Sequence, residues 1–196
     1  QMIWTREEDM QHDMYRPIAM SKFVGALDDK GQISAWTNRV AAPSVGFDTM
    51  QRLMGSMAMD MPDKNHIEGA FDQPYEIANM KIEQVRSKTP VPVGSWRSVG
   101  HSYNAFFVES FMDEMAHAAG KDPYEFRKAL LQNHPRHRAV LDLAASQAGW
   151  GLPLPKGGAR GIALHESFAG ESQANRRYLY FAAKAGHTGS LDPLAS

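Results

Sequence analysis

The sequence contains no cysteine. This absence excludes disulfide bonds, thiolate metal sites and iron–sulfur ligation within the chain. The chain also has no excess of positive charge, since its net charge is −1. It therefore has no overall electrostatic support for binding to nucleic acid or to an anionic membrane. No apolar run approaches the length that crosses a bilayer. We therefore expect neither a nucleic-acid partner nor a transmembrane segment.

Several familiar catalytic and metal-binding motifs are absent as well. The sequence has no Gly-x-Ser-x-Gly elbow and no Gly-Lys-Ser/Thr phosphate loop. Glu114 and His117 have the Glu-x-x-His spacing of di-iron bundles, but no second copy occurs, and a solvated helix face is the better interpretation. His165 and Glu166 lack the second histidine of a zinc-protease motif. No metal-ligating set is predicted within this chain.

The order of apolar, polar and turn-forming residues predicts an α+β fold. We expect a β-hairpin over residues 18–40, a short helix over 47–54 and mixed strands at 80–85 and 160–168. Three consecutive helices are predicted at about 102–119, 122–132 and 136–148. Gly120 is expected to end the first helix, Asp122 to cap the second, and residues 28–31 to form the turn of the hairpin. Residues 1–10 are expected to form a short apolar strand that runs into an acidic turn or helix start. A beginning in mid-strand predicts that the chain is part of a longer one.

Residues 90–120 are the most informative stretch. Pro90 and Pro92 favour extended backbone, and a turn bracketed by Gly94 and Gly100 leads into a helix with one apolar stripe. The first amides of a helix attract anions, and Arg97 adds a fixed cation that can bond in a bidentate way. The alternative is an ordinary loop-to-helix connection whose arginine pairs with a nearby carboxylate. Spacing alone does not decide between the two.

Methionine is concentrated in one segment. Five of the twelve methionines lie within twelve residues, at positions 50, 54, 57, 59 and 61. Methionine is a flexible, polarizable side chain that is frequent at adaptable binding surfaces. This segment predicts an irregular surface or an interface, so a non-catalytic protein-interaction domain with a methionine-rich surface is the alternative function.

Five segments carry a family resemblance in a fixed order. They are WTREEDM from Trp4, the hairpin after Tyr15-Arg16-Pro17, GSWRSVGHSYNAFFVESFMDEMA from Gly94, DPYEFRKALL from Asp122, and ARGIALHESF from Ala159. Together they resemble the large subunit of molybdenum hydroxylases of the xanthine dehydrogenase and aldehyde oxidase superfamily, in particular the β subunit of isoquinoline 1-oxidoreductase. Residues 1–168 would be part of a molybdopterin-binding domain, and residues 169–196 a divergent or non-native tail.

The resemblance implies an oxidoreductase that hydroxylates aldehydes or N-heteroaromatic compounds with oxygen derived from water. The implied cofactor is molybdopterin with molybdenum, in the cytosine dinucleotide form. The implied partners are the remainder of the large subunit and a small subunit that carries [2Fe–2S] clusters, in agreement with the lack of cysteine here. The resemblance suggests the bacterial periplasm, with the cytoplasm as the alternative. The chain alone is expected to be inactive.

Site residues follow from the same resemblance. The superfamily's aromatic-Arg-Gly-x-Gly loop is matched by residues 96–100. Val99 takes the place of an aromatic residue that stacks on substrate in purine-oxidising relatives. The hairpin region around Ser21 and Lys22 does not show the substrate-orienting arginine of those relatives, and the resemblance leaves open whether Lys22 substitutes for it. Val99 and Lys22 are expected in the substrate pocket, and a purine substrate is disfavoured. The Gly-x-Gly-Glu motif that supplies the general base does not occur, so no catalytic residue is assigned. The implied cofactor-binding residues are Gly94, Ser95, Trp96, Arg97 and Ser98.

Overall fold

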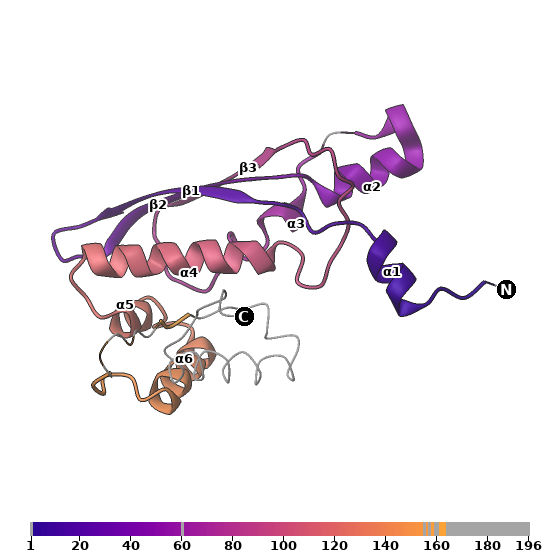
Figure 1. Cartoon of the computed structure of the whole chain (residues 1–196). Coiled ribbons are helices and arrows are strands. Elements are labelled where there is room, and N and C mark those ends of the chain that lie inside the picture. Colours follow the sequence, from indigo (N-terminus) through magenta and orange to yellow (C-terminus); the bar gives the residue numbers. More distant parts are fainter. Residues whose placement is uncertain (1, 60, 155, 157, 159–160, 164–196) are drawn as a thin grey trace. The chain divides into compact units, whose positions relative to one another are not determined.

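The computed structural model describes residues 2–59, 61–154, 156, 158 and 161–163. The chain divides into two compact units. The first comprises the residues up to Val24, Trp36–Asp72 and Met80–Phe107, and the second comprises Gly25–Ala35, Gln73–Asn79 and the described residues from Val108 onward. The elements, labelled in Figure 1, are α1 (Arg6–His12), β1 (Met20–Leu27), β2 (Ile33–Ala42), α2 (Val45–Met54), the 3-10 helix η1 (Gly55–Met57), α3 (Lys64–Ile67), β3 (Met80–Arg86), α4 (His101–Ala118), α5 (Pro123–Ala129) and α6 (Pro135–Gln147).

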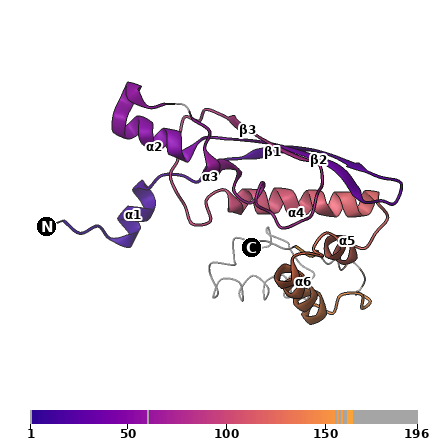
Figure 2. The same ribbon diagram turned by 180° about the vertical axis from the view of Figure 1, so that it is seen from behind.

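The strands form one sheet in the order β1-β2-β3, and they lie side by side in both views (Figures 1 and 2). β2 and β3 are parallel, with a register that runs from Trp36 opposite Met80 to Ala42 opposite Arg86. β2 lies in the centre and is the most buried strand, since Trp36, Val40 and Ala42 are at most 1% exposed. The predicted α+β class and the predicted strand at 80–85 are confirmed.

β1 and β2 form the predicted hairpin. Asp28 Oδ1 accepts hydrogen bonds from the N–H groups of Lys30 and Gln32, at 2.9 and 2.8 Å. A short acidic side chain that bonds to the following backbone is a typical turn former. Gly31 has φ 64°, a left-handed conformation that glycine adopts without steric cost. Lys121 Nζ donates to the carbonyl oxygens of Lys30 and Gly31, at 2.8 and 2.7 Å.

The three consecutive helices are confirmed as α4, α5 and α6. α4 ends as a Schellman motif, in which Gly120 has φ 63° and the Lys121 N–H donates to the Ala116 carbonyl at 2.9 Å. α5 begins at its predicted cap, where Asp122 accepts from two backbone N–H groups and a proline follows at the first helical position. α5 and α6 are neighbours in both views, and the Tyr124 hydroxyl donates to Asp142 Oδ1 at 2.7 Å.

The second unit contains a buried charged network that sequence patterning did not predict. Arg127 is fully buried, and its Nε donates to Glu109 Oε2 at 2.9 Å while Nη1 donates to Asp113 Oδ1 at 2.6 Å. Arg127 Nη2 donates to the backbone carbonyl of Glu109 at 2.9 Å. The Tyr75 hydroxyl completes the network by donating to the Glu109 carboxylate at 3.0 Å. Burial, together with the Glu109 charge, raises the pKa of Tyr75 well above its usual value, so the hydroxyl stays a donor.

The strand expected near the N-terminus is wrong, because residues 2–5 are not in a strand, whereas the helix start expected at the acidic residues is confirmed as α1. Thr5 Oγ1 caps this helix by accepting from the Glu8 N–H at 3.2 Å, and three acidic residues occupy the favoured first turn. Ile3 is 82% exposed and has no sheet to pack against. Residues 161–163 are not in a strand, whereas the other residues of the strand predicted at 160–168, and the tail at 169–196, lie outside the described residues.

Within the described part of the chain, no helix has both the length and the apolarity needed to span a membrane.

Candidate functional site

The loop that precedes α4 is attached to the segment before β1. The Tyr15 N–H donates to the Pro92 carbonyl at 2.9 Å, and the Gly94 N–H donates to the Tyr15 carbonyl at 3.0 Å. Tyr15 and Val93 therefore form a parallel β-bridge. Trp96 Nε1 adds a third attachment by donating to the Met14 carbonyl at 2.8 Å. The loop is thus held in place by backbone groups that lie far away in the sequence.

Gly94 and Gly100 are needed because other chain segments pass very close to them. A Cβ atom at Gly94 would lie 2.5 Å from the Cβ of Met14, and one at Gly100 would lie 2.2 Å from the carbonyl oxygen of Asn65. Real Cβ atoms essentially never come closer than 3.0 Å to such atoms. The absence of a side chain at each glycine therefore allows a neighbouring segment to come close, and any Cβ there would push that segment away.

Between these glycines the backbone is strained. Ser98 and Val99 have φ values of 71° and 42°. The left-handed region is uncommon for any residue except glycine, and a β-branched residue there is a genuine outlier. Ser98 occupies the position of the first glycine in the aromatic-Arg-Gly-x-Gly pattern described above. Strained backbone persists only where its surroundings hold it, and it clusters at functional sites.

The Arg16 side chain contacts this strained turn. Its Nη2 donates to the Arg97 carbonyl at 3.1 Å, and its Nη1 donates to Ser102 Oγ at 2.8 Å. The guanidinium lies 5.7 Å from the centre of the Trp96 ring, within cation–π range. Sequence reasoning placed Tyr15-Arg16-Pro17 in the family pattern but did not assign a site role to Arg16.

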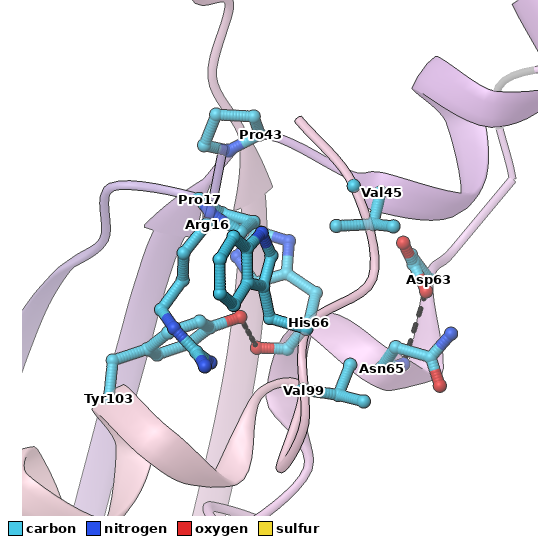
Figure 3. Close-up of a pocket in the computed structure, with 11 residues that line it drawn as sticks. Arg16, Pro17, Pro43, Val45, Asp63, Asn65, His66, Val99 and Tyr103 are labelled. Carbon is cyan, nitrogen blue, oxygen red and sulfur yellow. Dashed lines mark hydrogen bonds between the residues drawn. The ribbon is translucent and has the colours of Figure 1, made fainter. Parts of the chain in front are cut away.

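α3 and the first turn of α4 form the other side of the site. The Tyr103 hydroxyl donates to the His66 carbonyl at 2.9 Å, as Figure 3 shows, and Asn104 Nδ2 donates to the carbonyls of His66 and Glu68 at 3.1 and 2.8 Å. Asp63 Oδ2 accepts from Ser44 Oγ at 2.6 Å. These bonds join α3 to α4 and to the N-terminus of α2.

Burial controls the protonation of two residues here. It lowers the pKa of His66, against the opposing effects of the Asp63 charge and of a hydrogen bond with the Val40 backbone, so the imidazole is neutral near neutral pH. His66 is 3% exposed, and its Nε2 has no hydrogen-bond partner among the described residues. Burial, assisted by Asp63 and Glu68, raises the pKa of Tyr103 to about 12, although Arg16 acts in the opposite direction.

A small cavity lies between these elements (Figure 3). Its volume is about 10 Å³, which is room for about one water molecule, whereas small-molecule pockets usually have about 300–1,000 Å³. This cavity therefore does not enclose a ligand of pterin size by itself. The cavity is lined by Arg16, Pro17, Pro43, Val45, Asp63, Asn65, His66, Gly94, Trp96, Val99 and Tyr103.

The structure brings together some of the predicted site residues. Gly94, Trp96 and Val99 line the cavity, whereas Ser95 and Arg97 have exposed side chains beside it. Lys22 is exposed on β1 and is not part of the cavity lining. Sequence reasoning missed Arg16, His66 and Tyr103, and the Tyr15-Arg16-Pro17 pattern was the only available signal. No group of three or more acidic or histidine side chains suited to a metal ion occurs among the described residues.

The methionine-rich segment forms a separate groove on α2 and the residues after it. The groove has a volume of about 240 Å³ and is lined by all five methionines between positions 50 and 61, together with Asp63. Their exposed fractions run from 41% at Met54 to 71% at Met59. The predicted irregular methionine-rich surface is therefore confirmed, and its use as an interface stays a prediction.

Comparison with known sequences gives one family and several relatives. Residues 1–131 match the model of the molybdopterin cofactor-binding domain. The chain is 30% identical to the membrane-bound aldehyde dehydrogenase (pyrroloquinoline-quinone) of Gluconacetobacter polyoxogenes, covering 83% of this chain and 23% of that protein. It is 29% identical to one of the subunits of the nicotinate dehydrogenase of Pseudomonas putida, and the match covers 74% of this chain and 12% of that subunit. The β subunit of the isoquinoline 1-oxidoreductase of Brevundimonas diminuta is 28% identical, with coverage of 76% and 19%. The chain thus spans less than a quarter of each relative.

Solved structures agree on the fold. The aldehyde oxidoreductase of Desulfovibrio gigas has a TM-score of 0.50 at 18% identity and covers 73% of this chain and 17% of that one. Quinoline 2-oxidoreductase from Pseudomonas putida 86 has a TM-score of 0.51 at 16% identity, with coverage of 75% and 20%. At such low identity these similarities concern the fold alone.

Proposed function

The chain belongs to the molybdopterin cofactor-binding domain family, and from this premise we propose that it forms part of an oxidoreductase that hydroxylates aldehydes or N-heteroaromatic compounds with oxygen derived from water. The observation that carries the proposal is the family match over residues 1–131, which contains the whole loop from Gly94 to Gly100. The names of the relatives, which include an aldehyde dehydrogenase and an isoquinoline oxidoreductase, support the two substrate classes.

The donor set of the loop suits the proposed cofactor. Molybdopterin carries a phosphate and, when bound, supplies a metal centre that transfers oxygen and accepts two electrons from the substrate. The Arg97 guanidinium and the hydroxyls of Ser95 and Ser98 are donors for anionic oxygen. We assign the contact with the cofactor to the loop residues Gly94, Ser95, Trp96, Arg97 and Ser98.

The small cavity is consistent with this role if the loop forms only one wall of the cofactor site. A space of about 10 Å³ cannot hold a pterin, so the other walls must come from other chain segments. Val99 has no aromatic face on which a substrate ring could stack, so we expect a substrate other than a purine. We keep Lys22 as a candidate residue of the substrate pocket. It lies on an exposed surface of β1 outside this cavity.

The same proposal extends to the cofactor form and the partners. We propose the cytosine dinucleotide form of molybdopterin, a small subunit that carries [2Fe–2S] clusters, and further large-subunit residues. The lack of cysteine in this chain supports cluster ligation elsewhere, because protein-bound clusters are held mainly by cysteine thiolates. Two of the relatives are named as subunits, which supports an assembly of several chains.

The reaction is tested by the source of the product oxygen. The protein expressed in full from its gene should oxidise an aromatic aldehyde or an N-heterocycle with a dye as electron acceptor. In water enriched in oxygen-18, the product should gain one labelled oxygen. Oxidation without label from water, or activity that depends on added pyrroloquinoline quinone alone, would contradict the proposal.

A second candidate function is protein binding through the methionine-rich groove. The supporting observation is that five partly exposed methionines share one groove, since flexible thioether side chains adapt to partner surfaces. In the purified assembly, photo-methionine should cross-link to a co-purifying chain from Met57 and Met59 more than from Met2 and Met20, which are at least as exposed but lie outside the groove. Equal cross-linking from all four would contradict it.

A further inference from the structure

We propose that Arg16 is a positioning residue that holds Ser98 and Val99 in their left-handed conformation, and thereby sets the direction of the Arg97 side chain. The inference rests on the proposed function of the loop as a cofactor-binding wall. Arg16 is assigned no direct contact with the cofactor or with the substrate.

The need for such a residue comes from the backbone. Ser98 and Val99 are consecutive residues with positive φ, and neither is glycine. The short hydrogen bonds within the turn, from the Val99 N–H to the Trp96 carbonyl and from the His101 N–H to the Ser98 carbonyl, are both 2.9 Å long. Local bonds of this kind occur in many turns and do not select a left-handed one. An external restraint is therefore required.

Arg16 supplies the restraint on both sides of the strained pair. Its Nη2 binds the carbonyl of Arg97, the residue just before Ser98, and its Nη1 binds the hydroxyl of Ser102 in the first turn of α4. The planar guanidinium keeps these two donors at a fixed separation, so the distance between its two acceptors is fixed as well. A lysine has a single nitrogen and would not hold both acceptors at that separation.

The position of Arg16 is itself well defined. Tyr15 is joined to the loop by two backbone hydrogen bonds, and the Arg16 guanidinium lies against the Trp96 ring. The Trp96 indole is oriented in turn by its bond to the Met14 carbonyl. The backbone next to Arg16 and the ring that its guanidinium contacts are therefore both fixed to the same loop. Arg16 is held in one place, as a residue that restrains the turn must be.

Hydrogen exchange of the full protein tests the conformational part directly. Amides in residues 95–101 should exchange at least about 10-fold faster in Arg16→Ala than in the wild type, with Arg16→Lys in between. Arg39→Ala is the matched control, because Arg39 is an exposed arginine that pairs with Glu83 at 3.0 Å on the sheet, away from the loop. Unchanged exchange of residues 95–101 in Arg16→Ala would overturn the proposal.

Kinetics of the cofactor-loaded enzyme test the positioning part. Arg16→Ala should lower kcat at least about 10-fold with little change in KM, and added guanidinium ion should restore part of kcat. A loss that guanidinium does not restore, or a change in KM alone, would refute a positioning role. If the wild-type protein carries no molybdopterin, the proposed function fails, and the exchange measurement still decides whether Arg16 holds the turn.

Discussion

The buried network around Arg127 gives the most exacting test of the packing in the second unit. Replacing Arg127 with methionine keeps most of the side-chain volume and removes the cation. Glu109, with 8% of its side chain exposed, would lose its contact with Arg127 Nε at 2.9 Å, while the Tyr75 hydroxyl at 3.0 Å supplies a neutral donor and no compensating charge. Asp113 is 43% exposed and can turn to water.

The magnitude follows from that difference in exposure. Breaking a buried ion pair by removing one partner costs about 3–5 kcal/mol, because the remaining charge is left uncompensated. The loss of the Asp113 pair adds little, since partly exposed pairs contribute roughly 0–1 kcal/mol. We therefore expect Arg127→Met to lower the local stability of α4 and α5 by about 3–5 kcal/mol.

Native-state hydrogen exchange of the amides in α4 and α5 measures their local stability, and it does so without unfolding the rest of the protein. A loss of about 3–5 kcal/mol corresponds to exchange that is about 10²–10⁴-fold faster in the core of α4 and α5. The double variant Arg127→Met/Glu109→Gln removes both charges and should recover part of the loss. Lys128→Met is the control, because Lys128 pairs with the half-exposed Asp142 at 3.5 Å and should cost at most about 1 kcal/mol. An effect of Arg127→Met no larger than that of the control would refute the reasoning.

Three further predictions concern the candidate site. Gly100→Ala should destabilise the first unit by about 1–3 kcal/mol in chemical denaturation, since its Cβ would lie 2.2 Å from the Asn65 carbonyl oxygen. Gly161→Ala is the control and should cost less, because nothing lies within 4 Å of its Cβ and its φ is outside the left-handed region. His66 has a folded-state pKa below its unfolded value, so the unfolded state binds more protons and stability should fall as the pH drops below about 6.5. His66→Gln should weaken this pH dependence. If the denaturation midpoint of the variant changes with pH as steeply as that of the wild type, the prediction is wrong. Arg97→Ala should lower enzymatic activity while its circular dichroism stays that of the wild type; full turnover would contradict the assigned role.

The elements that local chemistry defines could be predicted from the sequence. The cap at Asp122, the end of α4 at Gly120 and the Asp28 turn each depend on a few neighbouring residues, and the structure has them where the sequence placed them. The strand predicted near the N-terminus was wrong because its apolar residues suggested burial. The helix start expected after it is confirmed, because Thr5 caps α1 and three acids occupy the favoured first turn.

Contacts between distant residues could not be predicted in this way. The role of Arg16 depends on the Arg97 carbonyl and the Ser102 hydroxyl, which are more than eighty positions away in the chain. The strain at Ser98 and Val99 was also hidden, because nothing in their residue types indicates a left-handed backbone. The burial of Arg127 could not be predicted either, because arginine is seldom buried unless it is paired, and its partner Glu109 lies 18 positions away on another helix.

The central claim is that the loop from Gly94 to Gly100 forms a wall of a molybdopterin site. The most direct measurement is the molybdenum and pterin content of the full protein, purified after expression with ample molybdate. The account predicts molybdenum and pterin in stoichiometric amounts in the wild type and a clear loss of both in a Gly94→Val/Arg97→Ala variant that keeps its helix content. A folded wild-type protein with neither molybdenum nor pterin would contradict it.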